Sequence, residues 1–432
     1  MAALRVRSVP GNAGGGCAFR GARFALLPIA DAAHVVHGPI TCQGHSWETR
    51  PTASSGSQLH RLAFTTDISE LDVVCGSEGK LRRAIAALVA RHRPPAVFVY
   101  QTCLPAVMGD DVSAICREAS LCHGIAVLPV LARGFDGGRV RGTEIAARLL
   151  LDHVIGTREP ACRTATDIVI IGEYNVAGEL DHIRPLLAAL GIRLLASVPG
   201  DGRFAEIAAA HRARLILALC SQAMGHLAEE LGARYAIPVL EGNFYGRAAT
   251  AATLRAMAHR LAESGGPADL PDRAEALIGR CQAESEIRLA PYRAILTGKR
   301  AVLVAGGAKS WGLAAALGEA GLEVVASSAH KCSARDRRQI GRTLGLDDPP
   351  ALDLGRLLAE GRADVVLSGG AAQFTVLSAG IPWVEVTHQR HMALSGYDGV
   401  VALAREVHTA LVNPVWAQLR PPAPWNLEGA RS

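Results

Sequence analysis

Units of strand, loop, helix and strand recur along this chain, and that recurrence constrains its fold more than any other feature. One unit runs from AVFVYQT (96–102) through the helical DVSAICREAS (111–120) to GIAVLPVLA (124–132). Further units begin near Thr166, Ala213, Lys299 and Ala363. Short apolar strands joined by helices form parallel sheets with helices on both faces. The sequence therefore predicts an α/β protein with several doubly wound parallel sheets.

A chain of 432 residues is too long for a single ordinary core. The units fall into three segments, separated by the loop TREPACRTATD and by a helical linker at about 273–298. We expect three Rossmann-like domains around a central metallocluster cavity. The N-terminal domain is predicted at 1–165, the middle domain at 166–290 and the C-terminal domain at 291–432.

Composition and charge exclude several classes of protein. Hydrophobic residues make up 49% and charged residues 20% of the chain, and the net charge is +5 without a basic block. We therefore expect no nucleic-acid partner. No run of about 18 uncharged apolar residues occurs, and the first ten residues lack the apolar core of a signal peptide. A cytoplasmic protein without a membrane partner is expected.

Three of the ten cysteines lie in glycine-rich or proline-rich turns or at a strand end. Cys17 follows three glycines, Cys42 follows Gly38-Pro39, and Cys103 follows a predicted strand. In a reducing compartment this pattern suggests a metal cluster more than disulfides. Three thiolates leave an iron–sulfur cluster short of ligands, so a partner chain would have to complete it. Because the spacing is no CxxC pattern, buried structural cysteines remain the alternative.

Other chemically useful residues also follow predicted strands, where ligands of parallel sheets sit. Cys220 and His388 are candidate ligands for the two ends of one buried cluster; a core thiol and a hydrogen-bonded loop histidine are the alternatives. Lys309 follows Gly306 and Gly307 in a turn that matches neither nucleotide-binding glycine motif, so we expect no ATP hydrolysis by this chain. The candidate cavity residues, each of which could instead be solvated, are Arg50, Arg139, Arg141, Lys309, Gln389 and Arg390.

Nine segments together resemble the nitrogenase component family. They are GGCAFRGA, HGPITCQGHSW, VYQTCLPAVMGDD, VIGTREP, IGEYNVAGEL, LEGNFYG, GGAKSW, SGYDG and NPVWAQLRPPAPW. The resemblance runs from about residue 15 to about residue 425. It is stronger to the α-like subunit of the cofactor-assembly scaffold (NifE) than to the catalytic molybdenum–iron α subunit.

The resemblance implies an α2β2 assembly with a β-like subunit of the NifK, NifN or MarK kind. Cys17, Cys42 and Cys103 match thiolates that share an interfacial iron–sulfur cluster, P-cluster-like or [4Fe-4S], with that subunit. Cys220 matches a ligand of a large [Fe8S9C]-type iron–sulfur cofactor, and Arg50 and Lys309 match basic positions of the cofactor cavity. The implied electron donor is a separate ATP-hydrolysing, NifH-like iron protein.

Two loops depart from the scaffold pattern. Residues 138–143 and 387–390 replace its usual cavity sequences, and His388 adds an imidazole that would help to retain a cofactor. These departures favour a nitrogenase-like reductase that performs ATP-dependent multi-electron reduction, with methylthio-alkane carbon–sulfur cleavage as one candidate. The alternative is a scaffold for iron–molybdenum cofactor biosynthesis. A cluster-free binding protein is the third hypothesis.

Overall fold

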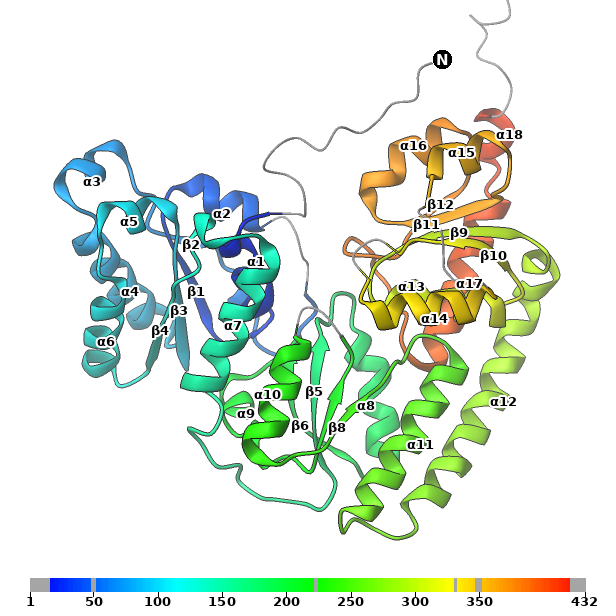
Figure 1. Cartoon of the computed structure of the whole chain (residues 1–432), viewed down its shortest axis with the longest axis horizontal. Coiled ribbons are helices and arrows are strands. Elements are labelled where there is room, and N and C mark those ends of the chain that lie inside the picture. Colours follow the sequence, from blue (N-terminus) through cyan, green and yellow to red (C-terminus); the bar gives the residue numbers. More distant parts are fainter. Residues whose placement is uncertain (1–15, 48–51, 221–223, 330–331, 346–351, 420–432) are drawn as a thin grey trace, which may run out of the picture. The chain divides into compact units, whose positions relative to one another are not determined.

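Three parallel four-stranded sheets form the framework of the protein. The computed structural model describes residues 16–47, 52–220, 224–329, 332–345 and 352–419. The strand orders are β2-β1-β3-β4, β6-β5-β7-β8 and β10-β9-β11-β12. Figure 1 labels all of these strands except β7. All three sheets have the same strand order. Counted along the chain, the second strand of each sheet lies at an edge, and the first strand lies between the second and the third. The predicted α/β class with doubly wound parallel sheets is confirmed.

The strands are short and mostly buried. They are β1 (Ala33–His37), β2 (Phe64–Thr65), β3 (Ala96–Gln101), β4 (Ala126–Val130), β5 (Asp167–Glu173), β6 (Arg193–Pro199), β7 (Leu215–Ala218), β8 (Val239–Glu241), β9 (Arg300–Val304), β10 (Glu323–Ser327), β11 (Val365–Ser368) and β12 (Trp383–Glu385). Every residue of β1, β3, β5 and β11 is buried. Helices cover both faces of such strands, so their sequences are continuously apolar and do not alternate.

Helices connect successive strands. They are α1 (Ala18–Leu26), α2 (Ile40–Trp47), α3 (Glu70–Cys75), α4 (Glu78–His92), α5 (Cys103–Met108), α6 (Val112–His123), α7 (Arg139–His153), α8 (Glu179–Ala189), α9 (Phe204–Ala208), α10 (Gly225–Tyr235), α11 (Arg247–Glu263), α12 (Leu270–Leu296), α13 (Ala308–Glu319), α14 (Ala334–Leu344), α15 (Leu354–Ala359), α16 (Gln373–Ser378), α17 (Gly396–Val412) and α18 (Val415–Leu419). Short 3-10 helices are η1 (Leu59–Arg61), η2 (Gly134–Asp136), η3 (Ala210–Arg212) and η4 (Gly370–Ala372). No helix in the ranges described here combines the length and apolar character needed to cross a membrane.

One strand differs from the sequence-based expectation. None of the units predicted from the sequence includes Ala33–His37, but these residues form β1 in the middle of the first sheet. The register pairs Ala33 with Val97 and His37 with Gln101. A five-residue strand buried on both faces carries no alternating pattern, so its sequence does not distinguish it from a buried helix.

The chain divides into two compact units. Unit 1 comprises Met1–Val176 and Ile192–Leu240, and unit 2 comprises Ala177–Gly191 and Glu241–Ser432. Helix α8 links β5 to β6 in the chain but packs against α17 within unit 2. The predicted linker at about 273–298 lies largely within the long helix α12. The predicted domain limits at 165 and 290 stay a prediction.

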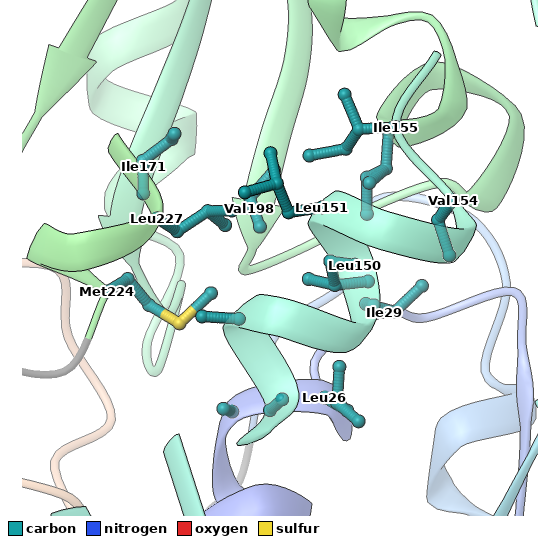
Figure 2. Packing of buried hydrophobic residues seen from close by; sticks show 14 of the residues in the cluster. Leu26, Ile29, Leu150, Leu151, Val154, Ile155, Ile171, Val198, Met224 and Leu227 are labelled. Atoms are coloured by element: carbon teal, nitrogen blue, oxygen red, sulfur yellow. The ribbon is translucent and has the colours of Figure 1, made fainter. Parts of the chain in front are cut away.

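Helix α7 joins the two sheets of unit 1 into one core. Figure 2 shows its Leu150, Leu151 and Val154 among side chains from α1, the α1–β1 loop, β5, β6 and α10. Leu150 is fully buried in this cluster. Removing so much apolar surface from water makes α7 a main stabilising element of unit 1.

Helices α1 and α7 cross at two glycines, Gly21 and Gly142. A Cβ built on Gly142 would fall on the backbone oxygen of Ala18, and one built on Gly21 would fall on the backbone oxygen of Arg139. Only residues without a side chain permit such a close backbone approach. This crossing fixes the first turn of α1 against the first turn of α7.

We predict that Gly142→Ala destabilises unit 1 by about 1–3 kcal/mol, because the added methyl forces the two helix backbones apart. Gly279→Ala is the matched control, since a Cβ at Gly279 in α12 meets no atom within 4 Å. That control should be neutral or stabilising by about 0.5–1 kcal/mol. Thermal and urea unfolding of both variants measures the difference. Equal stability of the two variants would contradict the close packing of α1 on α7.

Candidate cluster-binding site

The thiols of Cys103 and Cys220 occupy equivalent places in two sheets. Cys103 lies two residues beyond β3, and Cys220 lies two residues beyond β7. Strands β3 and β7 are each the third strand of their sheet and pair with its first strand. In doubly wound sheets ligands bind beyond the strand ends at the point where the strand order reverses. Both cysteines therefore stand at the ligand-binding edges of their own sheets.

Cys17 is held at the start of α1 by the loop that precedes α7. It forms an isolated antiparallel bridge with Gly138, and the amide of Ala18 donates to the carbonyl of Gly137 at 2.9 Å. Cys17 is also the residue that caps α1. The helix crossing and this bridge together place the Cys17 thiol beside the loop at 134–138.

Gly134 brings the thiols of Cys17 and Cys103 together. Its amide donates to Cys103 Sγ at 3.1 Å. A Cβ built on Gly134 would lie 2.5 Å from Cys103 Sγ and 3.7 Å from Cys17 Sγ. A side chain at this position would collide with Cys103 Sγ, so only glycine permits the backbone to approach the two sulfurs this closely.

Cys42 completes the group from the first turn of α2, where its amide donates to Pro39 at 3.0 Å. Burial raises the pKa of the Cys42 thiol, and the charges of Cys103 and Cys17 raise it further. Three neighbouring thiols oppose one another's ionisation. They can become thiolates together only when they bind a metal ion or the positively charged core of a metal cluster. The three-thiol site of Cys17, Cys42 and Cys103 is therefore suited to a metal cluster.

No three His, Cys, Asp or Glu side chains lie close enough to hold one metal ion within the portion of the chain described. A multi-iron cluster is wider than a single ion and is held by thiolates that stand further apart. The three thiol donors and the Gly134 amide, which donates to one of the sulfurs, fit such a cluster. When bound it would supply one-electron transfer, while the chain contributes the thiolates and the Gly134 amide.

His37 connects the two turns that carry Cys42 and Cys103. Its carbonyl accepts from the amide of Thr102 at 3.1 Å and from the Thr102 hydroxyl at 3.0 Å. Thr102 caps α5, whose first residue is Cys103. The next residue, Gly38, begins the turn into α2; a Cβ there would collide with Thr102.

The ring of His37 holds the far end of α5. Its Nε2 lies 2.9 Å from Asp110 Oδ2, and its Nδ1 lies 3.0 Å from the Thr66 hydroxyl. The Ser77 hydroxyl also bonds to Asp110. Burial lowers the pKa of His37 although the bond to Asp110 opposes this, so the histidine is a neutral hydrogen-bonding group. This buried network, which we call the His37 clamp, fixes both ends of α5 to β1.

Cys220 lies in a second setting within unit 1. A Cβ on Gly172 of β5 would come within 2.6 Å of the Cys220 Cβ, so this glycine makes room for the cysteine. Arg139 lies near enough for the Cys220 charge to raise its pKa, although desolvation dominates and lowers it. The Arg139 guanidinium also lies 3.8 Å from the centre of the Phe24 ring. A half-buried thiol and a half-buried cation therefore occur together here.

The glycine turn of unit 2 presents Lys309 in the first turn of α13. Gly307, after Gly306, has φ +61°, and a Cβ there would meet no atom within 4 Å. The ammonium of Lys309 lies 5.7 Å from the Tyr245 ring centre. The backbone of this turn is open to a ligand, and Lys309 supplies a positive charge beside it.

The charge of Arg390 is neutralised within unit 2 by Glu179. Their side chains are 1% and 0% exposed, and they form a direct ion pair. Desolvation raises the pKa of Glu179, but the charges of Arg390 and Lys309 outweigh it, so the pKa is lowered. Arg390 therefore has a carboxylate partner of its own, unlike a cation that awaits a ligand.

The remaining predicted site residues are scattered. Arg141 is 58% exposed and pairs with Glu144 on the surface of α7. His388 is half-buried and Gln389 exposed in the turn after β12, while Arg50 lies outside the described residues. Cys220 belongs to unit 1 and His388 to unit 2, so their pairing on one cluster stays a prediction.

Comparison with known proteins assigns the chain to a family. The family described as nitrogenase component 1 type oxidoreductase matches residues 17–412. The chain belongs to the nitrogenase component 1 family. Among solved structures, one titled "Nitrogenase Cp1 at pH 6.5" superimposes with a TM-score of 0.84 over 95% of this chain and 90% of its own, at 24% identity. That similarity shows the fold of the nitrogenase component 1 family in this chain.

Two relatives of this chain are NifE proteins. The nitrogenase iron-molybdenum cofactor biosynthesis protein NifE of Bradyrhizobium diazoefficiens is 47% identical over 421 residues, 96% of this chain and 77% of that protein. NifE of Klebsiella pneumoniae is 42% identical over 431 residues, 96% of this chain and 93% of that protein.

These relatives overturn the predicted function. The hypothesis of a nitrogenase-like reductase, and with it the assignment as an oxidoreductase subunit, is wrong, because the similarity to NifE extends over nearly the whole chain. Nothing in the comparisons supports methylthio-alkane reduction. The hypothesis gave too much weight to residues 138–143 and 387–390, and within them Arg141 is exposed and Arg390 is neutralised by Glu179.

Sequence reasoning missed three parts of the site in this nitrogenase component 1 chain: Gly134, the His37 clamp and Gly172. The signals were present, since His37 precedes the Gly-Pro turn of Cys42 and Asp110 follows the α5 helix of Cys103. A histidine and an aspartate far apart in sequence give no sign of contact until the sheet register places β1 beside β3.

We predict that Asp110→Ala lowers the stability of unit 1 by about 1–3 kcal/mol, because it leaves buried His37 and Ser77 groups unsatisfied. The same change should reduce the iron bound per chain, since α5 loses one of its anchors. Iron analysis and thermal unfolding measure both effects. Asp111→Ala is the control, because it removes only the hydrogen bond by which Asp111 caps the Ala114 amide. Loss of such a cap lowers the free energy of unfolding by about 1 kcal/mol. Equal iron content in the two variants would exclude the His37 clamp as a support of the three-thiol site.

Proposed function

We propose that this chain is the α-like subunit of a scaffold on which the nitrogenase iron–molybdenum cofactor is assembled. The observation that carries this proposal is the 42–47% identity to NifE proteins over at least 96% of the chain. In this function the iron–sulfur precursor is cargo: it binds, is completed and leaves for the apo-nitrogenase.

The three-thiol site is the proposed place of a permanent iron–sulfur cluster. Cys17, Cys42 and Cys103 supply three thiolates, and a β-like partner subunit in an α2β2 complex supplies the others. Cys103 is exposed, as a ligand at a subunit interface must be before its partner binds. The electron donor in this proposal is a separate ATP-hydrolysing iron protein.

Cys220 is the proposed anchor of the cargo in unit 1. Its thiolate provides one metal bond, and the half-buried guanidinium of Arg139 offsets the negative charge of the iron–sulfur cargo. In unit 2, Gly306, Gly307 and Lys309 form the proposed basic cradle, and His388 is the proposed second ligand. One thiolate and one imidazole with electrostatic support hold less firmly than a full thiolate set, which suits cargo that must leave.

The test is cofactor delivery by the purified complex of this chain with its β-like partner. Incubation with the iron protein, ATP, reductant, molybdate and an organic acid should yield cargo that activates apo-nitrogenase. Cys220→Ala should lower delivery about tenfold or more while iron at the three-thiol site persists. Cys17→Ala should remove that iron.

Cys122→Ala is the matched control, because Cys122 is an exposed thiol on α6 away from strand ends. It should deliver cargo as the unmodified complex does. A complex that binds a large iron–sulfur cluster but never passes it to apo-nitrogenase would contradict the scaffold function. Full delivery by Cys220→Ala would remove Cys220 as the anchor.

A further inference from the structure

Arg23 is a fully buried arginine that the proposed function does not use. It lies in the last turn of α1, is 1% exposed and is the largest fully buried side chain in the described ranges. Its Nη1 donates to Gln43 Oε1. Its Nε and Nη2 are buried without a hydrogen-bond partner. A buried guanidinium with two unsatisfied nitrogens is costly and calls for a compensating group.

No carboxylate within the described ranges forms an ion pair with Arg23. Its nearest aromatic neighbour is Tyr100, whose ring centre lies 6.0 Å from the guanidinium carbon. Burial lowers the pKa of Arg23 to about 10, so it remains charged at neutral pH. His34 is buried nearby, and its pKa is lowered to about 3, mainly by desolvation and further by the Arg23 charge. The surroundings of Arg23 are therefore neutral or basic.

Arg390 shows how the same chain neutralises another buried arginine. Its guanidinium is as deeply buried as that of Arg23, but Glu179 pairs with it directly. Breaking such a buried pair leaves an uncompensated charge, which is strongly destabilising. No equivalent carboxylate pairs with Arg23 in the part of the chain described, so its counter-charge has to come from outside those residues.

The neighbours of Arg23 lie on the elements that carry the three thiols. Helix α1, which bears Arg23, begins at Cys17. Gln43, which accepts its hydrogen bond, follows Cys42 in α2. Tyr100 lies in β3, the strand that leads to Cys103. The unpaired cation and the three-thiol site thus share one local framework within unit 1.

We propose that Arg23 is the buried counter-cation of the anionic iron–sulfur cluster held at Cys17, Cys42 and Cys103. This rests on the cluster of the proposed function. Thiolates and sulfides make such a cluster negative, and reduction makes it more negative still. A fixed positive charge inside the protein favours both cluster retention and reduction, because the low local dielectric screens it little. Arg23 acts through the electric field and through Gln43, so it is a positioning residue and no ligand.

The test uses the α2β2 complex with Arg23→Met, Arg23→Lys and Arg148→Met. Arg148 is 69% exposed, so its variant controls for a change in net charge alone. In the cluster-loaded complex, Arg23→Met should shift the cluster's reduction potential to a more negative value and speed iron loss to a chelator about tenfold. Arg23→Lys should restore most of both properties. Arg148→Met should match the unmodified complex.

In the cluster-free complex, the Arg23→Met substitution should stabilise the protein. After chelation, Arg23→Met should unfold at a higher temperature than the unmodified protein, because it removes an uncompensated buried charge. Arg23→Met could instead lower thermal stability equally with and without the cluster and leave the cluster's reduction potential unchanged. That result would show that Arg23 has only a packing role and would overturn the proposal. The proposal would also be overturned if Arg23→Met changed only the binding of cargo and had no effect in the Cys220→Ala background. An unmodified complex without iron would instead overturn the proposed function itself.

Discussion

The close crossing of α1 and α7 at Gly21 and Gly142 is the contact on which the site depends. Backbone meets backbone there, because any side chain would occupy the space of the facing carbonyl. The crossing brings the start of α1, and so Cys17, to the loop at 134–138. Beyond the crossing, the same helix α7 carries the leucines that join the two sheets of unit 1. One helix thereby couples the stability of the core to the position of a thiol.

The three sheets share one strand order but differ in the residue that stands just beyond the third strand. Cys103 lies there after β3, Cys220 after β7, and Gly370 after β11. The geometry of a doubly wound sheet offers the same binding edge each time. The residue placed there decides the chemistry. In the proposed scaffold the first thiol serves electron transfer and the second serves the cargo, while the third sheet contributes backbone and charge from its glycine turn.

Three arginines that are buried or half-buried differ in how their charge is balanced. Arg390 is neutralised by Glu179, so it stabilises the turn after β12 and offers no charge to a ligand. Arg139 stacks on Phe24 and Arg23 donates to Gln43, and neither forms an ion pair among the residues described. Charge that a protein leaves uncompensated in its interior is available to an anionic guest. The sequence singled out Arg139 and Arg390 but not Arg23, since an arginine in a chain carries no mark of its future partner.

The sequence by itself determined the architecture: continuous apolar runs joined by helices specify buried parallel strands, and the strand ends then mark where Cys103, Cys220 and Lys309 lie. It did not reveal β1, because a five-residue strand buried on both faces has no periodicity. Only the tertiary structure decided which groups meet. The His37–Asp110 contact, the Gly134–Cys103 contact and the Arg390–Glu179 pair each join residues far apart in the chain. Such contacts depend on register and helix crossing, which local sequence does not encode.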